Sequence, residues 1–136
     1  MSITLAAGIT PELAELWDRA HRDVLTKRGG GALIATLTDG MPEHDLLGVV
    51  VASAALWTYE DAEGLKGFAL CRASLVEAVY VAHEFRRQKI ATSLVRALID
   101  GPTPPIDAYA LPGDRGMKSL YESIGWKARL LTMRGA

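Results

Sequence analysis

Apolar residues recur every three or four positions in the first part of the chain, which is the spacing of an amphipathic helix. The first such helix is expected to begin at Pro11, after the capping residue Thr10, and to end before Gly29. Its apolar face comprises Leu13, Leu16, Trp17, Ala20 and Val24. A second helical region is expected over residues 32–53, broken near residues 40–42 where glycine and proline disfavour a continuous helix.

The middle of the chain changes to short apolar and aromatic runs, which are typical of strands. The runs cover residues 55–60, 65–73 and 76–81, and the turn-like residues 61–64 separate the first two. This arrangement predicts an antiparallel meander of three strands.

The last third of the chain alternates between the two patterns. A helix is expected over residues 89–100 and another after residues 112–113, ending at Gly125, with short strands over residues 106–111 and 126–133. The order of elements is strand, helices, three strands, helix, strand, helix, strand, which predicts a single mixed α/β domain over the whole chain, residues 1–136.

Composition narrows the functional classes. The chain has 136 residues, of which 49% are hydrophobic, enough for one sizeable core, and its net charge of −1 gives no general attraction to nucleic acid or anionic membranes. The first residues do not resemble a secretory signal, so a cytoplasmic location is expected. The longest apolar stretch, residues 46–57, is too short to span a bilayer. Cys71 is the single cysteine and no metal-ligand cluster surrounds it, so neither a disulfide nor a metal site is expected.

Residues 79–94 form the most informative segment, because a strand passes through a basic loop directly into an apolar helix. A helix N-terminus carries free amides and partial positive charge, so it can bind a pyrophosphate. Arg86, Arg87 and Lys89 add formal charge to this loop. Small side chains keep the first helical turn narrow: Ala91, Thr92 and Ser93. The competing interpretation is a solvated basic loop before a helix.

This loop resembles the acetyl-CoA signature of the GNAT superfamily of N-acetyltransferases, which reads Gln or Arg, two residues, Gly, one residue, and Gly or Ala. Arg86 and Ala91 fit, whereas Lys89 stands where the family usually has Gly. A later stretch resembles the family's C-terminal pattern, in which an Asn precedes a Tyr-Glu pair that is followed by Gly and an aromatic residue. The fitting residues are Tyr121, Glu122, Gly125 and Trp126. Asp114 replaces the Asn, and it can alternatively serve only as a helix N-cap.

The resemblance implies the GNAT fold, a mixed, mostly antiparallel sheet of about six strands flanked by helices. Its two splayed central strands would be residues 76–81 and 106–111, and the pantetheine arm of acetyl-CoA would enter between them. The residues implied to bind this co-substrate are Val79, Tyr80, Val81, Arg86, Arg87, Gln88, Lys89, Ile90, Ala91, Thr92, Ser93, Asp114 and Tyr121.

The resemblance also implies direct attack of a primary amine on the acetyl carbonyl. Tyr121 would be the acid that protonates the leaving thiolate, although an aromatic residue on an apolar helix face is the alternative. Glu77 is the candidate base, with a paired core carboxylate as its alternative. The acceptor pocket is expected near the first helix and second strand, where the candidates are Trp17, His21, Arg22, Trp57 and Tyr59. The acceptor itself remains open between a small molecule, a protein lysine and a protein N-terminus.

Two other functions remain compatible with the sequence. One is a GNAT-like module that binds acyl-CoA without catalysis, and the other is an α/β interaction domain without a cofactor. After Trp126 there is room for one strand where the family commonly has two, so a second subunit can cover the free sheet edge in a homodimer.

Overall fold

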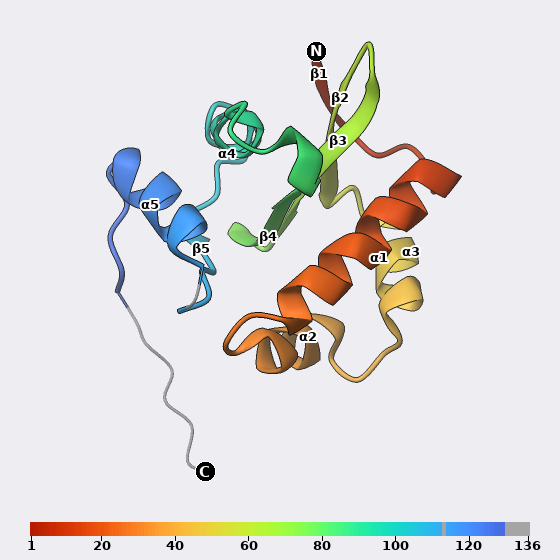
Figure 1. Ribbon diagram of the computed structural model, residues 1–136, viewed down its shortest axis with the longest axis horizontal. Helices are drawn as coiled ribbons and strands as arrows, with labels where there is room; N and C mark the ends of the chain where they lie inside the picture. Colours follow the sequence, from red (N-terminus) through yellow and green to blue (C-terminus); the bar gives the residue numbers. More distant parts are fainter. Residues whose placement is uncertain (113, 130–136) are drawn as a thin grey trace.

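A computed structural model describes residues 1–112 and 114–129 (Figure 1). Its elements in chain order are β1 (Ser2–Leu5), α1 (Pro11–Leu25), α2 (Gly30–Thr38), α3 (Glu43–Ala52), β2 (Leu56–Asp61), β3 (Gly64–Arg72), β4 (Leu75–Val81), a 3-10 helix (His83–Phe85), α4 (Ile90–Ile99), β5 (Asp107–Ala108) and α5 (Arg115–Ser123). This order confirms the predicted mixed α/β architecture. None of the helices in these ranges combines the length and the hydropathy that a membrane span needs.

The five strands form one open sheet in the order β1-β2-β3-β4-β5. The first three pairings are antiparallel, as expected for the meander, and β4 pairs with β5 in parallel. The sheet is therefore mostly antiparallel, and within the described residues it has one strand fewer than the expected six. The prediction of a strand over residues 126–133 is wrong for residues 126–129, and residues 130–133 lie outside the described residues.

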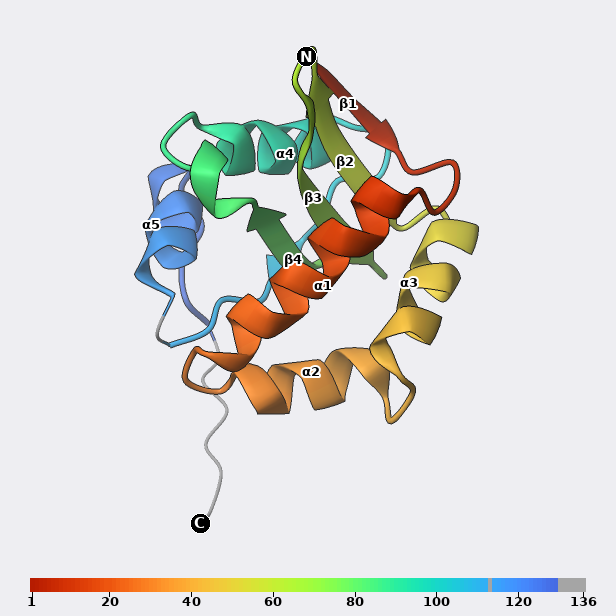
Figure 2. The ribbon, with the colours of Figure 1, turned by 45° about the vertical axis from the view of Figure 1, so that its right-hand side comes forward.

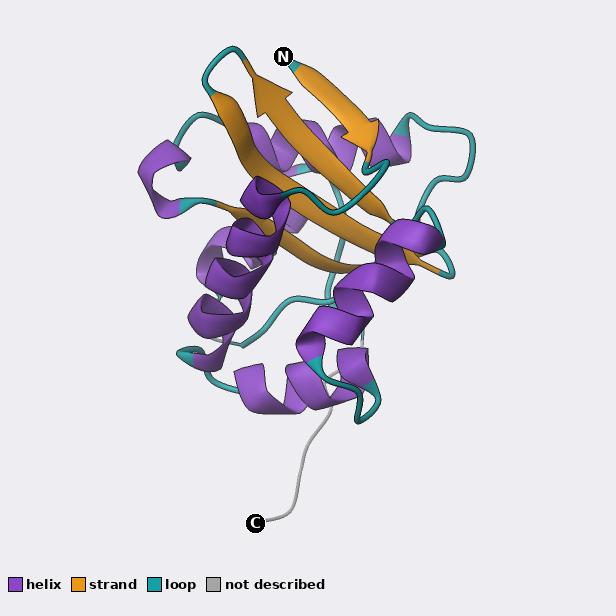
Figure 3. Ribbon diagram, turned by 90° about the vertical axis from the view of Figure 1, so that its right-hand side faces the viewer, coloured by secondary structure: helices purple, strands orange, loops and turns teal. Residues whose placement is uncertain are grey.

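Helices cover both faces of the sheet, so the chain builds two apolar layers. Helices α1, α2 and α3 lie on one face (Figure 2), and α4 lies on the other (Figure 3). In the first layer Trp17 packs against Phe68 of β3, with ring centroids 5.4 Å apart. In the second, Ile90 and Leu94 of α4 are buried against Val81 of β4. Successive residues of β4 thus point alternately towards the two helical layers.

The start of α1 follows the sequence pattern closely. The amide of Leu13 donates to the hydroxyl of Thr10 at 3.1 Å, and Pro11 occupies the first turn. The start of α2 differs from the prediction, because the helix begins at Gly30 instead of residue 32. A Cβ atom at Gly30 would lie 1.8 Å from the carbonyl oxygen of Val24, so only glycine permits this close contact with α1.

The expected strand over residues 106–111 is much shorter than predicted. Its pairing with β4 is limited to Asp107 and Ala108, and the last contact is a 2.9 Å hydrogen bond from the amide of Tyr109 to the carbonyl of Val76. β4 continues to Val81, so its second half extends beyond the end of β5. The expected separation of the two strands is therefore present in the described residues.

Candidate functional site

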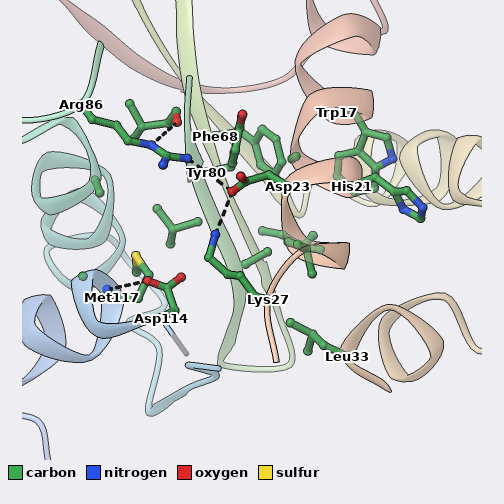
Figure 4. Close-up of a pocket in the computed structure, with 18 of the residues that line it drawn as sticks. Trp17, His21, Asp23, Lys27, Leu33, Phe68, Tyr80, Arg86, Asp114 and Met117 are labelled. Atoms are coloured by element: carbon green, nitrogen blue, oxygen red, sulfur yellow. Dashed lines mark hydrogen bonds and ion pairs between the residues drawn. The ribbon is translucent and has the colours of Figure 1, made fainter. Parts of the chain in front are cut away.

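A cavity of about 740 Å³ opens where the second half of β4 meets α1, α2 and the first turns of α4 and α5. In Figure 4, Trp17 and His21 lie at one end of this cavity, and Asp114 and Met117 lie at the other. Cavities of this size are typical of small-molecule and cofactor sites. Both the basic loop and the first helix contribute to its walls, so two segments distant in sequence share one site.

The first turn of α4 presents free backbone amides to the cavity. Lys89 is the N-cap, and its carbonyl accepts from the amide of Ser93 at 3.0 Å. The preceding amides of Ile90, Ala91 and Thr92 donate to no other described residue, and all three residues line the cavity. This is the arrangement of an anion-binding helix N-terminus.

The loop before α4 has a backbone that favours glycine. Arg87 and Lys89 have φ angles of +68° and +60°, both in the left-handed region. This conformation costs a residue with a Cβ atom about 1–2 kcal/mol. Lys89 stands at the position where the signature has Gly, so the conformation of this residue gives a physical reason for the usual glycine.

Arg86 is already engaged by the protein. Its Nε donates to the carbonyl of Val81 at 3.1 Å, and its guanidinium lies 3.4 Å from Asp23 of α1. Asp23 also accepts from Lys27 at 2.8 Å. Burial raises the pKa of the Asp23 carboxyl, but the hydrogen bonds and charges of Lys27 and Arg86 outweigh it and leave the pKa below its usual value. Arg86 therefore ties the loop to β4 and α1, while Arg87 and Lys89 form no ion pair with any described residue.

The free edge of β4 provides a second set of backbone groups. The amide of Ala82 donates to the carbonyl of Lys66 at 2.9 Å, so it points towards β3. Because amides alternate along a strand, those of Val79 and Val81 point to the opposite edge. No strand in residues 1–112 or 114–129 pairs with that edge beyond Val76.

Comparison with known proteins supports this architecture. The sequence matches no protein-family model and no curated protein sequence. Among solved structures it resembles AAC(6')-Iy in complex with the bisubstrate analogue CoA-S-monomethyl-acetylneamine, with a TM-score of 0.52 and 19% identity over 77% of this chain and 88% of that one. The chain has the GNAT fold. A ribosomal-protein-alanine N-acetyltransferase from Brucella melitensis biovar Abortus 2308 is less similar, with a TM-score of 0.47 and 19% identity over 83% of this chain and 95% of that one, and we base no conclusion on it.

Within the GNAT fold, the other residues expected to bind the co-substrate differ in position. Tyr80 lines the cavity and packs on Phe68, with ring centroids 6.0 Å apart. Gln88 and Ser93 are not among the residues that line it, and the hydroxyl of Ser93 donates to the carbonyl of Lys89 at 3.0 Å. The structure thus brings most, but not all, of the predicted residues to the cavity.

Asp114 is both a helix N-cap and a residue of the cavity, the two roles that the sequence left as alternatives. Its carboxylate accepts from the amide of Met117 at 3.1 Å, which makes it the N-cap of α5. It also lines the cavity together with Met117 and Leu120 of the same helix. The cap therefore holds the first turn of α5 against the site.

Tyr121 lies behind this turn. Its side chain is 7% exposed, stacks on Trp126 with ring centroids 5.5 Å apart, and is not part of the cavity lining. Burial, reinforced by the charge of Asp114, raises the pKa of the Tyr121 phenol well above its usual value. The phenol stays protonated at neutral pH.

Glu77 lies away from the cavity lining and is paired. Its carboxylate accepts from the guanidinium of Arg72, which also donates to the carbonyl of Leu37 at 3.0 Å. The register between β3 and β4 shifts at this point, since Leu70 faces Ala78 whereas Cys71 faces Val76, and Glu77 is the extra residue of the bulge. The alternative of a paired core carboxylate is what the structure shows.

Sequence patterns did not indicate one pair of residues at the opposite end of the cavity. Nδ1 of His21 lies 2.6 Å from Oε2 of Glu43, and both residues line the cavity. Trp17 holds the start of α3 in place, because its indole donates to the carbonyl of Glu43 at 3.1 Å. Of the five residues expected near the acceptor, Trp17 and His21 line this cavity, whereas Arg22, Trp57 and Tyr59 do not. Glu43 belongs to another helix than His21, and no local motif marks it.

Proposed function

We propose that this chain is a GNAT-superfamily N-acetyltransferase that binds acetyl-CoA and transfers its acetyl group to a primary amine. The observation that carries the proposal is the first turn of α4, whose free amides open into the cavity beside the unpaired edge of β4. A long ligand fits these two sets of backbone groups if its diphosphate lies at the free amides of α4 and its amide-containing arm lies along the unpaired edge of β4.

The phosphate contacts would come from three amides and two side chains. The amides of Ile90, Ala91 and Thr92 would donate to the pyrophosphate of CoA, aided by the positive end of the helix dipole. Arg87 and Lys89 line the same part of the cavity and would add charge. Arg86 would contribute to phosphate binding indirectly, because it holds the backbone of the loop before α4 in place.

The pantetheine arm would pair with β4 as an added strand. The amides of Val79 and Val81 face the open edge, and one of them would donate to the thioester carbonyl as negative charge develops on its oxygen. The carbonyl of Val81 already accepts from Arg86, so this arm would use the amides more than that carbonyl.

The reaction would proceed by direct transfer. The nitrogen of a neutral amine forms a bond to the acetyl carbon, and the carbon–sulfur bond breaks with its electron pair on sulfur. The nitrogen then loses a proton and the thiolate gains one, which gives an N-acetyl product and CoA. Tyr121 is the proposed proton donor, and its phenol must reach past the first turn of α5 to act. Glu77, paired with Arg72, is not included in this mechanism.

The proposal is tested by binding and turnover on the same preparation. We expect calorimetric binding of CoA, and release of free thiol from acetyl-CoA with at least one member of a panel of primary amines. Arg87→Ala removes an unpaired cation at the phosphates and should weaken CoA binding about tenfold. Lys118→Ala is the matched control, since this exposed residue of α5 does not line the cavity. Absence of CoA binding would refute the proposal.

A non-catalytic acyl-CoA-binding module is the second candidate, favoured by the fact that Tyr121 and Glu77 do not line the cavity. Such a module would bind CoA and leave the thioester intact with every amine. The cytoplasmic location and the homodimer remain predictions from the sequence, and gel filtration tests the latter.

A further inference from the structure

We propose that the acceptor is a small primary amine carried on an apolar body, and that His21, held by Glu43, is the base that removes its proton. This inference rests on the proposed function, because it assigns the end of the cavity that the coenzyme would leave free.

The walls at this end select an apolar acceptor. The residues contributed by α1, α2, α3 and β3 are chiefly apolar or aromatic: Trp17, Leu33, Ile34, Leu37, Leu46 and Phe68. Thr38 also lines the cavity, but its hydroxyl already donates to the carbonyl of Ile34 at 2.8 Å. A strongly polar acceptor would lose its hydration here without receiving hydrogen bonds in return.

The polar side chains on these walls, besides Thr38 and Asp23, are the pair of His21 and Glu43. Nδ1 lies 2.6 Å from Oε2 without the geometry of a hydrogen bond, and a carboxylate at this distance attracts a proton to Nδ1. Nε2 then carries the free lone pair and can accept a proton from a molecule in the cavity. The carboxylate of Glu43 stabilises the imidazolium that results.

Two more titratable side chains, Asp18 and His44, lie next to this pair but outside the cavity lining. Oδ1 of Asp18 and Oε2 of Glu43 are buried and accept no hydrogen bond from any described residue, apart from the contact of Oε2 with His21. His44 adds a ring 3.9 Å from Asp18 and 4.0 Å from Glu43, and it is largely exposed. Burial, and secondarily Asp18, raise the pKa of the Glu43 carboxyl even though the charge of His21 lowers it. Glu43 is the member of this group of three (Asp18, Glu43 and His44) that lines the cavity, so its carboxylate would attract the ammonium group of an acceptor.

The other carboxylates of the cavity are poor bases. Asp23 is held by Lys27 and Arg86, and its lowered pKa reduces its affinity for a proton. Asp114 accepts from the first turn of α5 at the opposite end of the cavity. In the described part of the lining, His21 with Glu43 is therefore the base that is not committed elsewhere.

The proton balance is complete. The ammonium group gives one proton to Nε2 of His21, and the resulting neutral amine attacks the acetyl carbon. The thiolate of CoA takes a proton from the phenol of Tyr121, and the second proton, lost by the nitrogen after attack, restores that phenol. His21 returns its proton to solvent before the next cycle.

The first test compares 2-phenylethylamine with spermidine as acceptors. We expect kcat/KM for 2-phenylethylamine to be at least about tenfold higher, because its ring can be buried where the second and third amines of spermidine cannot. If CoA binds but 2-phenylethylamine receives no acetyl group, or if spermidine is preferred, the inference fails and the proposed function stands. Loss of CoA binding would refute the proposed function itself.

The second test assigns the base. His21→Gln should lower kcat/KM for 2-phenylethylamine about a hundredfold at pH 7, and the loss should become smaller as the pH rises and more of the amine is neutral in solution, while CoA affinity stays within twofold of wild type. His44→Gln, at an exposed ring outside the lining, should retain the wild-type rate at each pH. A His21→Gln variant with the wild-type pH profile would overturn the assignment.

Discussion

At the scale of single residues, the backbone of Lys89 determines the shape of the proposed phosphate site. Its φ of +60° places it in the left-handed region at the N-cap of α4. Glycine adopts this conformation without the steric cost of a Cβ atom, although it loses more entropy on folding.

Lys89→Gly should therefore be more stable than Lys89→Ala by about 1 kcal/mol in free energy of unfolding. Both variants lack the ammonium group, so the difference reports the backbone alone. Urea denaturation of the two variants measures it. Equal stabilities would show that the loop does not hold residue 89 in the left-handed region.

The buried phenol of Tyr121 should make the free energy of unfolding decrease at alkaline pH. Since burial raises its pKa in the folded chain above the ordinary value of 10.0, the unfolded chain loses the proton first as pH rises. The stabilisation that the buried, protonated phenol gives to the folded chain is fully present below pH 10, and it decreases as the pH rises above 10. Tyr121→Phe should flatten the decline in free energy of unfolding between pH 9 and pH 11, measured in urea. A slope unchanged by the substitution would contradict this environment for the phenol.

Several residue-scale features could be predicted from the sequence because they depend on neighbours in the chain. The caps at Thr10 and Asp114 are of this kind, and both are present. The pair of His21 and Glu43 could not be predicted, because it forms only when α3 packs against α1. That the residues of the proposed phosphate site bind phosphate remains a prediction. The structure shows where the free amides of α4 and the charges of the preceding loop lie.

At the scale of elements, the first turn of α5 depends on its cap. Asp114→Ala removes the hydrogen bond to the amide of Met117 and should cost about 1 kcal/mol in free energy of unfolding. It should also weaken CoA binding, because this turn lines the cavity.

Asp114→Asn is the matched control, since asparagine caps equally well and is the residue that the family usually carries there. Thermal denaturation and calorimetry compare the two variants. If the Asn variant lost as much stability as the Ala variant, the cap would not be the source of the effect.

The elements whose lengths were misjudged are those that depend on tertiary contacts. Residues 106–111 have a strand-like pattern, but the chain leaves β4 after Tyr109, so only two residues pair as a strand. α2 starts at Gly30 because this glycine fits against the carbonyl of Val24. In contrast, α1 and α4 were predicted nearly to their ends, since their long apolar faces specify them locally.

At the scale of the whole molecule, the order of elements was sufficient to predict a mixed α/β domain, and the structure shows a sheet covered by helices on both faces. The residues at the two ends of the cavity were expected from the sequence in part, but the single cavity that joins them could not be predicted, because it forms only when the first helices pack beside α4 and α5. The two layers meet at the unpaired half of β4, where the proposed coenzyme and acceptor would face each other.

The most direct test of this account is the titration of ¹⁵N-labelled protein with CoA, followed by amide chemical shifts. The account predicts the largest shifts at Ile90, Ala91 and Thr92, with a second group at Val79 and Val81, and smaller shifts in α3. Shifts confined to other regions, or none at saturating CoA, would contradict the claim that the start of α4 binds the coenzyme's phosphates.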